Sequence, residues 1–198
     1  EVTPHVDVAQ ATEFMEKCCH GVSNVVKELV TTVATGVRSR QPLFAFLSGL
    51  PGTGKTHLLS ALSQYLTQAQ VPHRMPDPSL LDTDSPALTA WIRSHPSPPV
   101  LLIDPWEALS PAGERVVRGL GGAVVCVAAG RTIPPALPLD RILDLPVPDS
   151  PARTALLQAL LPPLCPHSSP PSPAALSALT PSALPRDLVR LLSAAALR

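Results

Sequence analysis

The residue types most able to do chemistry in this chain stand together in residues 49–56, which read G-L-P-G-T-G-K-T. Glycines in such a loop let consecutive backbone N–H groups point inward at phosphate oxygens. Lys55 supplies a cation for the β- and γ-phosphates of a nucleotide, and the Thr56 hydroxyl is a ligand for magnesium. The segment predicts a phosphate-binding loop for Mg-ATP, with contacts expected from Gly49, Pro51, Gly52, Thr53, Gly54, Lys55 and Thr56.

A second chemical feature is the carboxylate of Asp104, which directly follows the apolar run of residues 100–103. Such a run predicts a buried strand, and open α/β sheets bind ligands beyond the carboxyl ends of their strands. We therefore expect Asp104 to hold the same magnesium ion as Thr56, directly or through water. The alternative is that Asp104 caps the turn before Pro105 and takes no part in binding.

The rest of the chain predicts the elements that must position these residues. Apolar runs at 43–48, 100–103, 123–129 and 142–145 predict buried strands, and segments 55–69, 85–95 and 113–120 predict helices between them. Residues 8–35 have helical periodicity interrupted at Gly21, which allows two helices or one kinked helix. All-apolar strands that alternate with helices indicate a parallel sheet covered on both faces.

The chain changes character after Pro148, where no further strand is predicted. Asp149 or Ser150 can cap a helix over 151–161, and shorter helices are predicted at 173–179 and 185–197. The expected organisation is an N-terminal helical segment over 1–40, an α/β domain over 41–148 and a small all-helical lid over 149–198. The α/β domain is expected to be a P-loop NTPase three-layer sandwich.

Composition narrows the class of partner and the compartment. Lys+Arg and Asp+Glu both total 15, so no basic excess favours nucleic acid, which stays possible but without support. No apolar run reaches the roughly 18 residues that cross a bilayer, and residue 1 onward lacks the pattern of a signal peptide. Cys18, Cys19, Cys126 and Cys165 lack the paired spacing of a zinc site. We expect them to be structural, in a reducing intracellular compartment, cytoplasmic or nuclear.

With these motifs, roughly residues 40–198 resemble the AAA+ ATPases, and the phosphate loop is the most specific point of likeness. In that family the strand that ends in the metal-binding aspartate continues with a glutamate that polarises the attacking water. Here Pro105 stands at that position, and the nearest carboxylate is Glu107 in the sequence D-P-W-E. The resemblance therefore implies ATP binding, and makes hydrolysis depend on Glu107.

The resemblance also implies roles for residues farther along the chain. The family's polar sensor 1 residue corresponds to Arg131 or Thr132, which follow the predicted strand 123–129. Arg141 falls where an arginine finger is often found. Arg186, in the sequence A-L-P-R-D-L, resembles the sensor 2 arginine of the lid, which reaches across to the γ-phosphate.

The function implied by this resemblance is an ATPase module that remodels or loads a macromolecular partner. Such modules assemble with themselves or with other ATPase subunits, so a homo- or hetero-oligomer and a protein partner are expected. The alternative, favoured by Pro105, is a non-hydrolysing nucleotide-dependent scaffold or switch subunit within a multiprotein complex. A small-molecule kinase would share the loop but would need an acceptor pocket, of which the sequence shows no sign.

Overall fold

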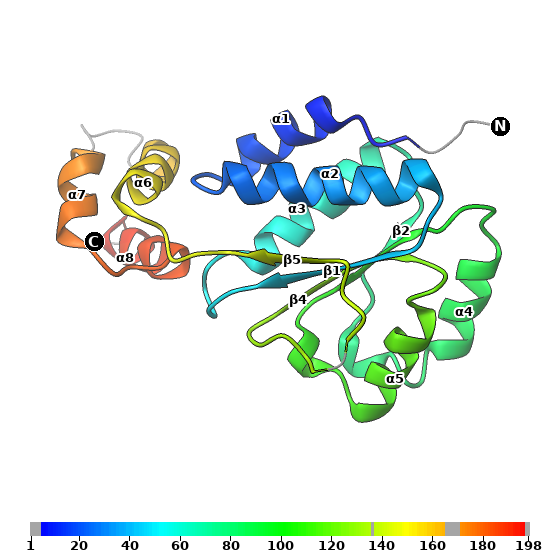
Figure 1. Ribbon diagram of the computed structural model, residues 1–198. Helices are drawn as coiled ribbons and strands as arrows, with labels where there is room; N and C mark the ends of the chain where they lie inside the picture. Colours follow the sequence, from blue (N-terminus) through cyan, green and yellow to red (C-terminus); the bar gives the residue numbers. More distant parts are fainter. Residues whose placement is uncertain (1–4, 136, 165–170, 197–198) are drawn as a thin grey trace.

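The computed structural model describes residues 5–135, 137–164 and 171–196, which form an α/β fold (Figure 1). The strands are β1 (Leu43–Ser48), β2 (His73–Arg74), β3 (Val100–Ile103), β4 (Val125–Gly130) and β5 (Arg141–Asp144). The helices are α1 (Val8–Cys18), α2 (Ser23–Ser39), α3 (Lys55–Gln68), α4 (Ser85–Arg93), α5 (Pro111–Leu120), α6 (Ser150–Leu164), α7 (Pro173–Leu179) and α8 (Pro185–Ala196). Two short 3-10 helices, η1 (Pro78–Leu80) and η2 (Trp106–Ala108), complete the elements.

The five strands form one parallel sheet in the order β2-β3-β4-β1-β5. In this register Ser48 is opposite both Gly130 of β4 and Asp144 of β5, while Ile103 is opposite Ala128. The carboxyl ends of β1, β3, β4 and β5 therefore finish at one edge of the sheet, where the chain continues into the predicted site residues.

The sequence predicts four of the five strands, with bounds that differ by at most two residues. The strand predicted at 123–129 is observed as Val125–Gly130, and the one predicted at 142–145 is observed as Arg141–Asp144. Strand β2 escapes prediction because it has two residues, both polar, and carries no apolar run. It forms only through its pairing with β3.

Helices cover both faces of the sheet, as the all-apolar strands predict (Figure 1). Side chains alternate along a strand, so Ala45 and Leu47 of β1 pack with α1, α2 and α3 in one core. Phe44 and Phe46 point to the opposite face and pack in a second core, where their rings lie 6.1 and 6.2 Å from that of Trp106. Burial on both faces fixes the register, since a slip of one residue would exchange the two cores.

The N-terminal region forms two helices, one of the two arrangements that its periodicity allows. Helices α1 and α2 are separated by a turn over residues 19–22, in which Gly21 has a φ of +78°. Asp7 caps α1 by accepting a hydrogen bond from the backbone N–H of Gln10 at 3.0 Å. Both helices contribute to the same core as α3, so they are packed onto the sheet rather than appended to it.

Helices α6, α7 and α8 form a separate cluster after the last strand (Figure 1). Their contact is a small apolar core centred on Leu157, Leu161 and Leu188. Helix α6 extends three residues beyond the predicted end, through Pro162 and Pro163. Of the two residues predicted to cap it, Asp149 does so, since its Oδ1 accepts a hydrogen bond from the N–H of Ala152 at 2.8 Å.

Two further sequence features have structural outcomes. Cys126 is fully buried, as predicted, and burial raises its pKa; Cys18, Cys19 and Cys126 are free thiols, whereas Cys165 lies outside the described residues. Among the helices that the structure describes, none combines the length and apolarity needed to cross a membrane.

Candidate functional site

The loop of residues 49–54 lies between β1 and α3, where the motif predicts it. Gly52 has a φ of +94° and Gly54, the N-cap of α3, a φ of +106°. Residues with a side chain rarely adopt this left-handed backbone conformation, so glycine is required at both positions. Thr53 closes the turn, because its N–H and its hydroxyl donate to the Leu50 carbonyl at 3.3 and 2.9 Å.

Lys55 lies at the first position of α3 with its side chain turned back over the loop. Its Nζ donates hydrogen bonds to the carbonyls of Gly49 at 2.6 Å and Leu50 at 3.0 Å. Partial burial lowers the pKa of Lys55, while the nearby carboxylates of Glu107 and Asp104 act in the opposite direction. The ammonium group is thus held at the loop by carbonyl oxygens, with two carboxylates near enough to affect its charge.

Asp104 and Thr56 meet across the edge of the sheet. Asp104 follows β3, Thr56 lies in the first turn of α3, and the Thr56 hydroxyl is near enough to the Asp104 carboxylate to lower its pKa. Burial is the main cause that raises the pKa of Asp104; the Thr56 hydroxyl and Lys55 oppose it, and Glu107 adds to it. The structure therefore brings together the two side chains predicted to hold magnesium.

These oxygens suit a magnesium ion bound together with a nucleotide. Magnesium is commonly bound through one or two protein oxygens, with phosphates and water completing its octahedron. The described residues contain no group of three or more His, Cys, Asp or Glu side chains placed to hold a metal ion. A cation at Thr56 and Asp104 would therefore take its other ligands from phosphate and water.

Glu107 lies in η2, just past Asp104, and its carboxylate reaches the end of β4. Its Oε1 accepts a short hydrogen bond from the N–H of Arg131 and another from the N–H of Thr132 at 3.3 Å. Gly130 makes this approach possible, because a Cβ there would lie 2.9 Å from the Glu107 oxygen. Glu107 is at the site, but one of its two oxygens is engaged by backbone.

The α6–α8 cluster contacts the loop of residues 49–54 through Arg186 at the start of α8. The backbone N–H of Arg186 donates to the Gly52 carbonyl at 3.3 Å. The Arg186 side chain lies over the same residue, since a Cβ on Gly52 would be 3.1 Å from its Nε. The arginine predicted from the lid sequence is therefore adjacent to the predicted phosphate loop.

A cleft of about 1890 Å³ connects these groups. It is lined by residues 51–56, Asp104, Glu107, Arg131, the β5–α6 connection and inward faces of α6 and α8. This volume exceeds the roughly 300–1,000 Å³ of common small-molecule pockets, so the cleft has room for a nucleotide and more.

The sequence did not predict several parts of the cleft wall, among them the α1–α2 turn, Asp149 and Arg190. The turn reaches the cleft because His57 of α3 contacts the Cys18 carbonyl at 2.8 Å. On the other side, a Cβ on Gly21 would be 3.0 Å from Ala152 of α6. The sequence does contain a signal for Arg190. It follows Arg186 by four residues, a spacing that places both arginines on the same face of a helix.

Three predicted residues do not line the cleft: Gly49, whose carbonyl accepts a hydrogen bond from Lys55, and the residues Arg141 and Thr132. Arg141 is exposed at the start of edge strand β5, opposite Ala45 and three residues before the carboxyl end of the strand. Thr132 contributes its backbone N–H to Glu107, but only its neighbour Arg131 lines the cleft. Within one chain, then, neither side chain lies beside the phosphate loop.

Comparison with models of known protein families gives no match for this chain, and comparison with curated proteins gives none either.

Proposed function

We propose that this chain is an AAA+-type module that binds Mg-ATP in the cleft between its sheet and its lid. One observation carries the proposal: the G-x-x-x-x-G-K-T loop adjoins the Asp104 carboxylate, which lies near Thr56, and Arg186, which lies over Gly52. A phosphate-binding loop, an acidic magnesium ligand and a second cation are the groups that a nucleoside triphosphate requires.

Each group has a defined part in this proposal. The loop N–H groups and the N-terminal end of α3 bind phosphate oxygens, and Lys55 exchanges its carbonyl partners for the β- and γ-phosphates. Thr56 and Asp104 hold the cation that neutralises the phosphates. Arg186 adds a guanidinium from the lid, so that nucleotide binding changes the lid's position against the sheet. That movement would transmit nucleotide state to a macromolecular partner, as in remodelling or loading ATPases.

A calorimetric titration of Mg-ATP into the purified chain tests the binding step. Lys55→Ala should weaken affinity about 100-fold or more, because it removes charged hydrogen bonds to two phosphates. Lys27→Ala, which removes an exposed lysine of α2, is the matched control and should bind as the unchanged chain does. Equal affinity of all three chains would show that ATP does not use this loop.

A second function, a nucleotide-dependent switch that does not hydrolyse ATP, is favoured by the contacts of Glu107. A general base needs a free carboxylate oxygen directed at the attacking water. Here Oε1 of Glu107 accepts from two backbone N–H groups, and Pro105 stands where the resemblance places the base. Single-turnover measurement of phosphate release separates the two functions: release linked to partner assembly supports the ATPase, and tight binding without release supports the switch.

A further inference from the structure

A second hollow is lined by residues of α4 and α5. These two helices cover the sheet face opposite α1, α2 and α3 (Figure 1). The volume of the hollow is about 370 Å³, and it shares no lining residue with the larger cleft. Helix α4 lines it with residues 85, 89, 92 and 93, which lie on one helical face. At the α-helical rise this face is about 12 Å long, so the hollow is an elongated groove.

The floor of the groove is apolar and open. Ile92 of α4 and Val116 and Leu120 of α5 line it, and Ile92 is 5% exposed. Gly119 contributes free space, because a Cβ built there meets no atom within 4 Å. The groove therefore has open space beside Gly119 for an apolar side chain.

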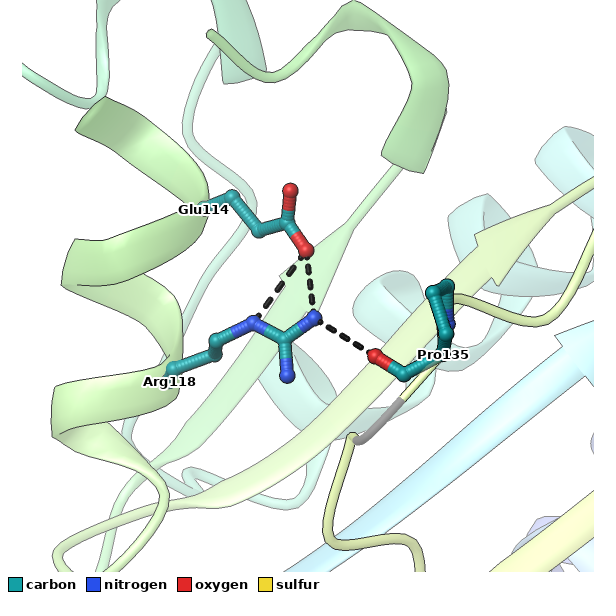
Figure 2. Close-up of polar contacts among 3 residues, drawn as sticks. All are labelled: Glu114, Arg118 and Pro135. Atoms are coloured by element: carbon teal, nitrogen blue, oxygen red, sulfur yellow. Dashed lines mark hydrogen bonds and ion pairs between the residues drawn. The ribbon is translucent and has the colours of Figure 1, made fainter. Parts of the chain in front are cut away.

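The rim of the groove is cationic. Arg93 of α4 and Arg115 of α5 are exposed and face the groove from its two sides, and no Asp or Glu lines it. The sole carboxylate of α5, Glu114, is engaged by Arg118, whose Nε and Nη2 lie 3.1 and 2.5 Å from its Oε1. Figure 2 shows this pair, with Arg118 also donating to the Pro135 carbonyl at 3.0 Å. Glu114 is therefore not placed to neutralise the groove.

We propose that this groove binds a short acidic peptide segment of a protein partner, with an apolar side chain on the floor and carboxylates at Arg93 and Arg115. An extended chain covers the groove's length with about four residues. Bidentate hydrogen bonds to carboxylates suit the two guanidinium groups, and the hydroxyls of Ser85 and Thr89 can donate to peptide carbonyls. No aromatic side chain lines the groove, so the stacking surface of single-stranded nucleic acid sites is missing there.

The test measures fluorescence anisotropy of a labelled peptide, Glu-Leu-Glu-Leu-Glu, titrated with the full chain at low and high salt. We expect saturable binding that weakens with salt, and no binding of the peptide Gln-Leu-Gln-Leu-Gln. Arg93→Gln and Arg115→Gln should each weaken binding about tenfold, the effect of losing a charged hydrogen-bonded pair. Gly119→Leu should abolish it by filling the floor.

Matched controls separate the groove from general charge and folding effects. Arg38→Gln removes an exposed arginine on α2, and Ala90→Leu adds bulk to an exposed position of α4 outside the groove; both should bind normally. Circular dichroism confirms that every variant is folded. The proposal is overturned by absence of binding at about 1 mM chain, by equal binding of the glutamine peptide, or by no effect of Gly119→Leu. Tighter binding of oligothymidine, lost in the same three variants, would overturn it in favour of nucleic acid.

Discussion

Arg186 donates its backbone N–H to the carbonyl of Gly52, at 3.3 Å, and lays its side chain over the same residue. This contact joins the first turn of α8 to the loop of residues 49–54. If nucleotide binds at this loop, as we propose, a change in the loop's conformation would be transmitted directly to α8.

Gly52→Ala should disturb the loop and the lid together. A Cβ at this position would lie 3.1 Å from the Arg186 Nε, and the φ of +94° is strained for any side chain. We expect a loss of about 1–2 kcal/mol, which corresponds to a fall of about 2–8 °C in the thermal midpoint, and weaker nucleotide binding. Gly119→Ala is the control, since it lies in helix α5 with open space around it, and should leave both quantities unchanged or slightly improved. An unaltered midpoint for Gly52→Ala would mean that the loop and lid are not tightly packed.

Asp104→Asn should stabilise the chain without ligand while it removes the magnesium site. Burial raises the pKa of Asp104 in the folded state above its ordinary 3.8. At pH values between 3.8 and this raised pKa, the folded state therefore binds more protons than the unfolded state. The free energy of unfolding contributed by Asp104 therefore falls as pH rises through this interval, and the cost is fully present above it. Asparagine keeps an acceptor for Thr56 without the charge. We expect a higher thermal midpoint than that of the unchanged chain at neutral pH.

The thermal midpoints of Asp104→Asn and of the unchanged chain can also be compared as a function of pH. The advantage of Asp104→Asn over the unchanged chain should shrink toward acid pH, where Asp104 is protonated in both states. Magnesium-dependent nucleotide binding should be lost at every pH. A variant that is less stable than the unchanged chain at neutral pH would show that the Asp104 charge is well compensated in the folded state.

Glu107 accepts hydrogen bonds from the backbone just after β4. We therefore expect Glu107→Ala and Glu107→Gln to differ in stability. Glu107→Ala leaves the N–H groups of Arg131 and Thr132 without their acceptor, which costs about 1–3 kcal/mol for a buried donor and less for these exposed ones. Glu107→Gln keeps a carbonyl oxygen and should retain most of the stability. If Glu107 also acts as the base, Glu107→Gln should nevertheless abolish phosphate release while Mg-ATP still binds. Equal melting curves for the alanine and glutamine variants would argue against a stabilising role for these hydrogen bonds.

The sequence could predict much of the fold because the strands that carry the core are continuous apolar runs. Residues 43–48 and 100–103 admit no other buried element of that length, and both appear as strands with those bounds. Strand β2 could not be predicted, since its residues His73 and Arg74 are polar and pair only through the backbone. The extension of α6 through Pro162 and Pro163 runs against the usual effect of proline on helices.

The candidate site likewise has a part that the sequence could predict and a part that depends on tertiary contacts. Lys55, Thr56 and Asp104 were predictable, because each is fixed in place by a local rule: the loop motif or the end of a strand. The engagement of Glu107 by backbone N–H groups depends on how closely η2 approaches Gly130, which is a tertiary relationship. The α1–α2 turn joins the cleft through His57 and Ala152, two contacts between segments far apart in sequence. No pattern along the chain encodes such contacts.

The two predicted arginines differ in position, and the difference gives the last prediction. Arg186 lies over the loop of its own chain, so Arg186→Ala should weaken Mg-ATP binding about tenfold by removing a charged contact. Arg141 is exposed on the free edge strand β5, away from the cleft of its own chain. If it acts at all on nucleotide, it must act on a neighbouring subunit. Arg141→Ala should then leave binding unchanged and lower hydrolysis only in an assembly, where an arginine in trans can contribute about 10³-fold or more.

Mixing experiments separate the two roles sharply. In an assembly that combines Arg141→Ala chains with Lys55→Ala chains, a complete site forms only where the intact Arg141 of a Lys55→Ala chain lies beside the intact loop of an Arg141→Ala chain. Such a mixture should fall below the activity of either chain mixed with unchanged protein, because few neighbours then form a complete site. Arg38→Gln, an exposed arginine on α2, serves as the surface control and should have no effect. If Arg141→Ala weakens binding in the isolated chain while Arg186→Ala does not, the positions of the two arginines have been given the wrong roles, and the proposal for the lid fails with them.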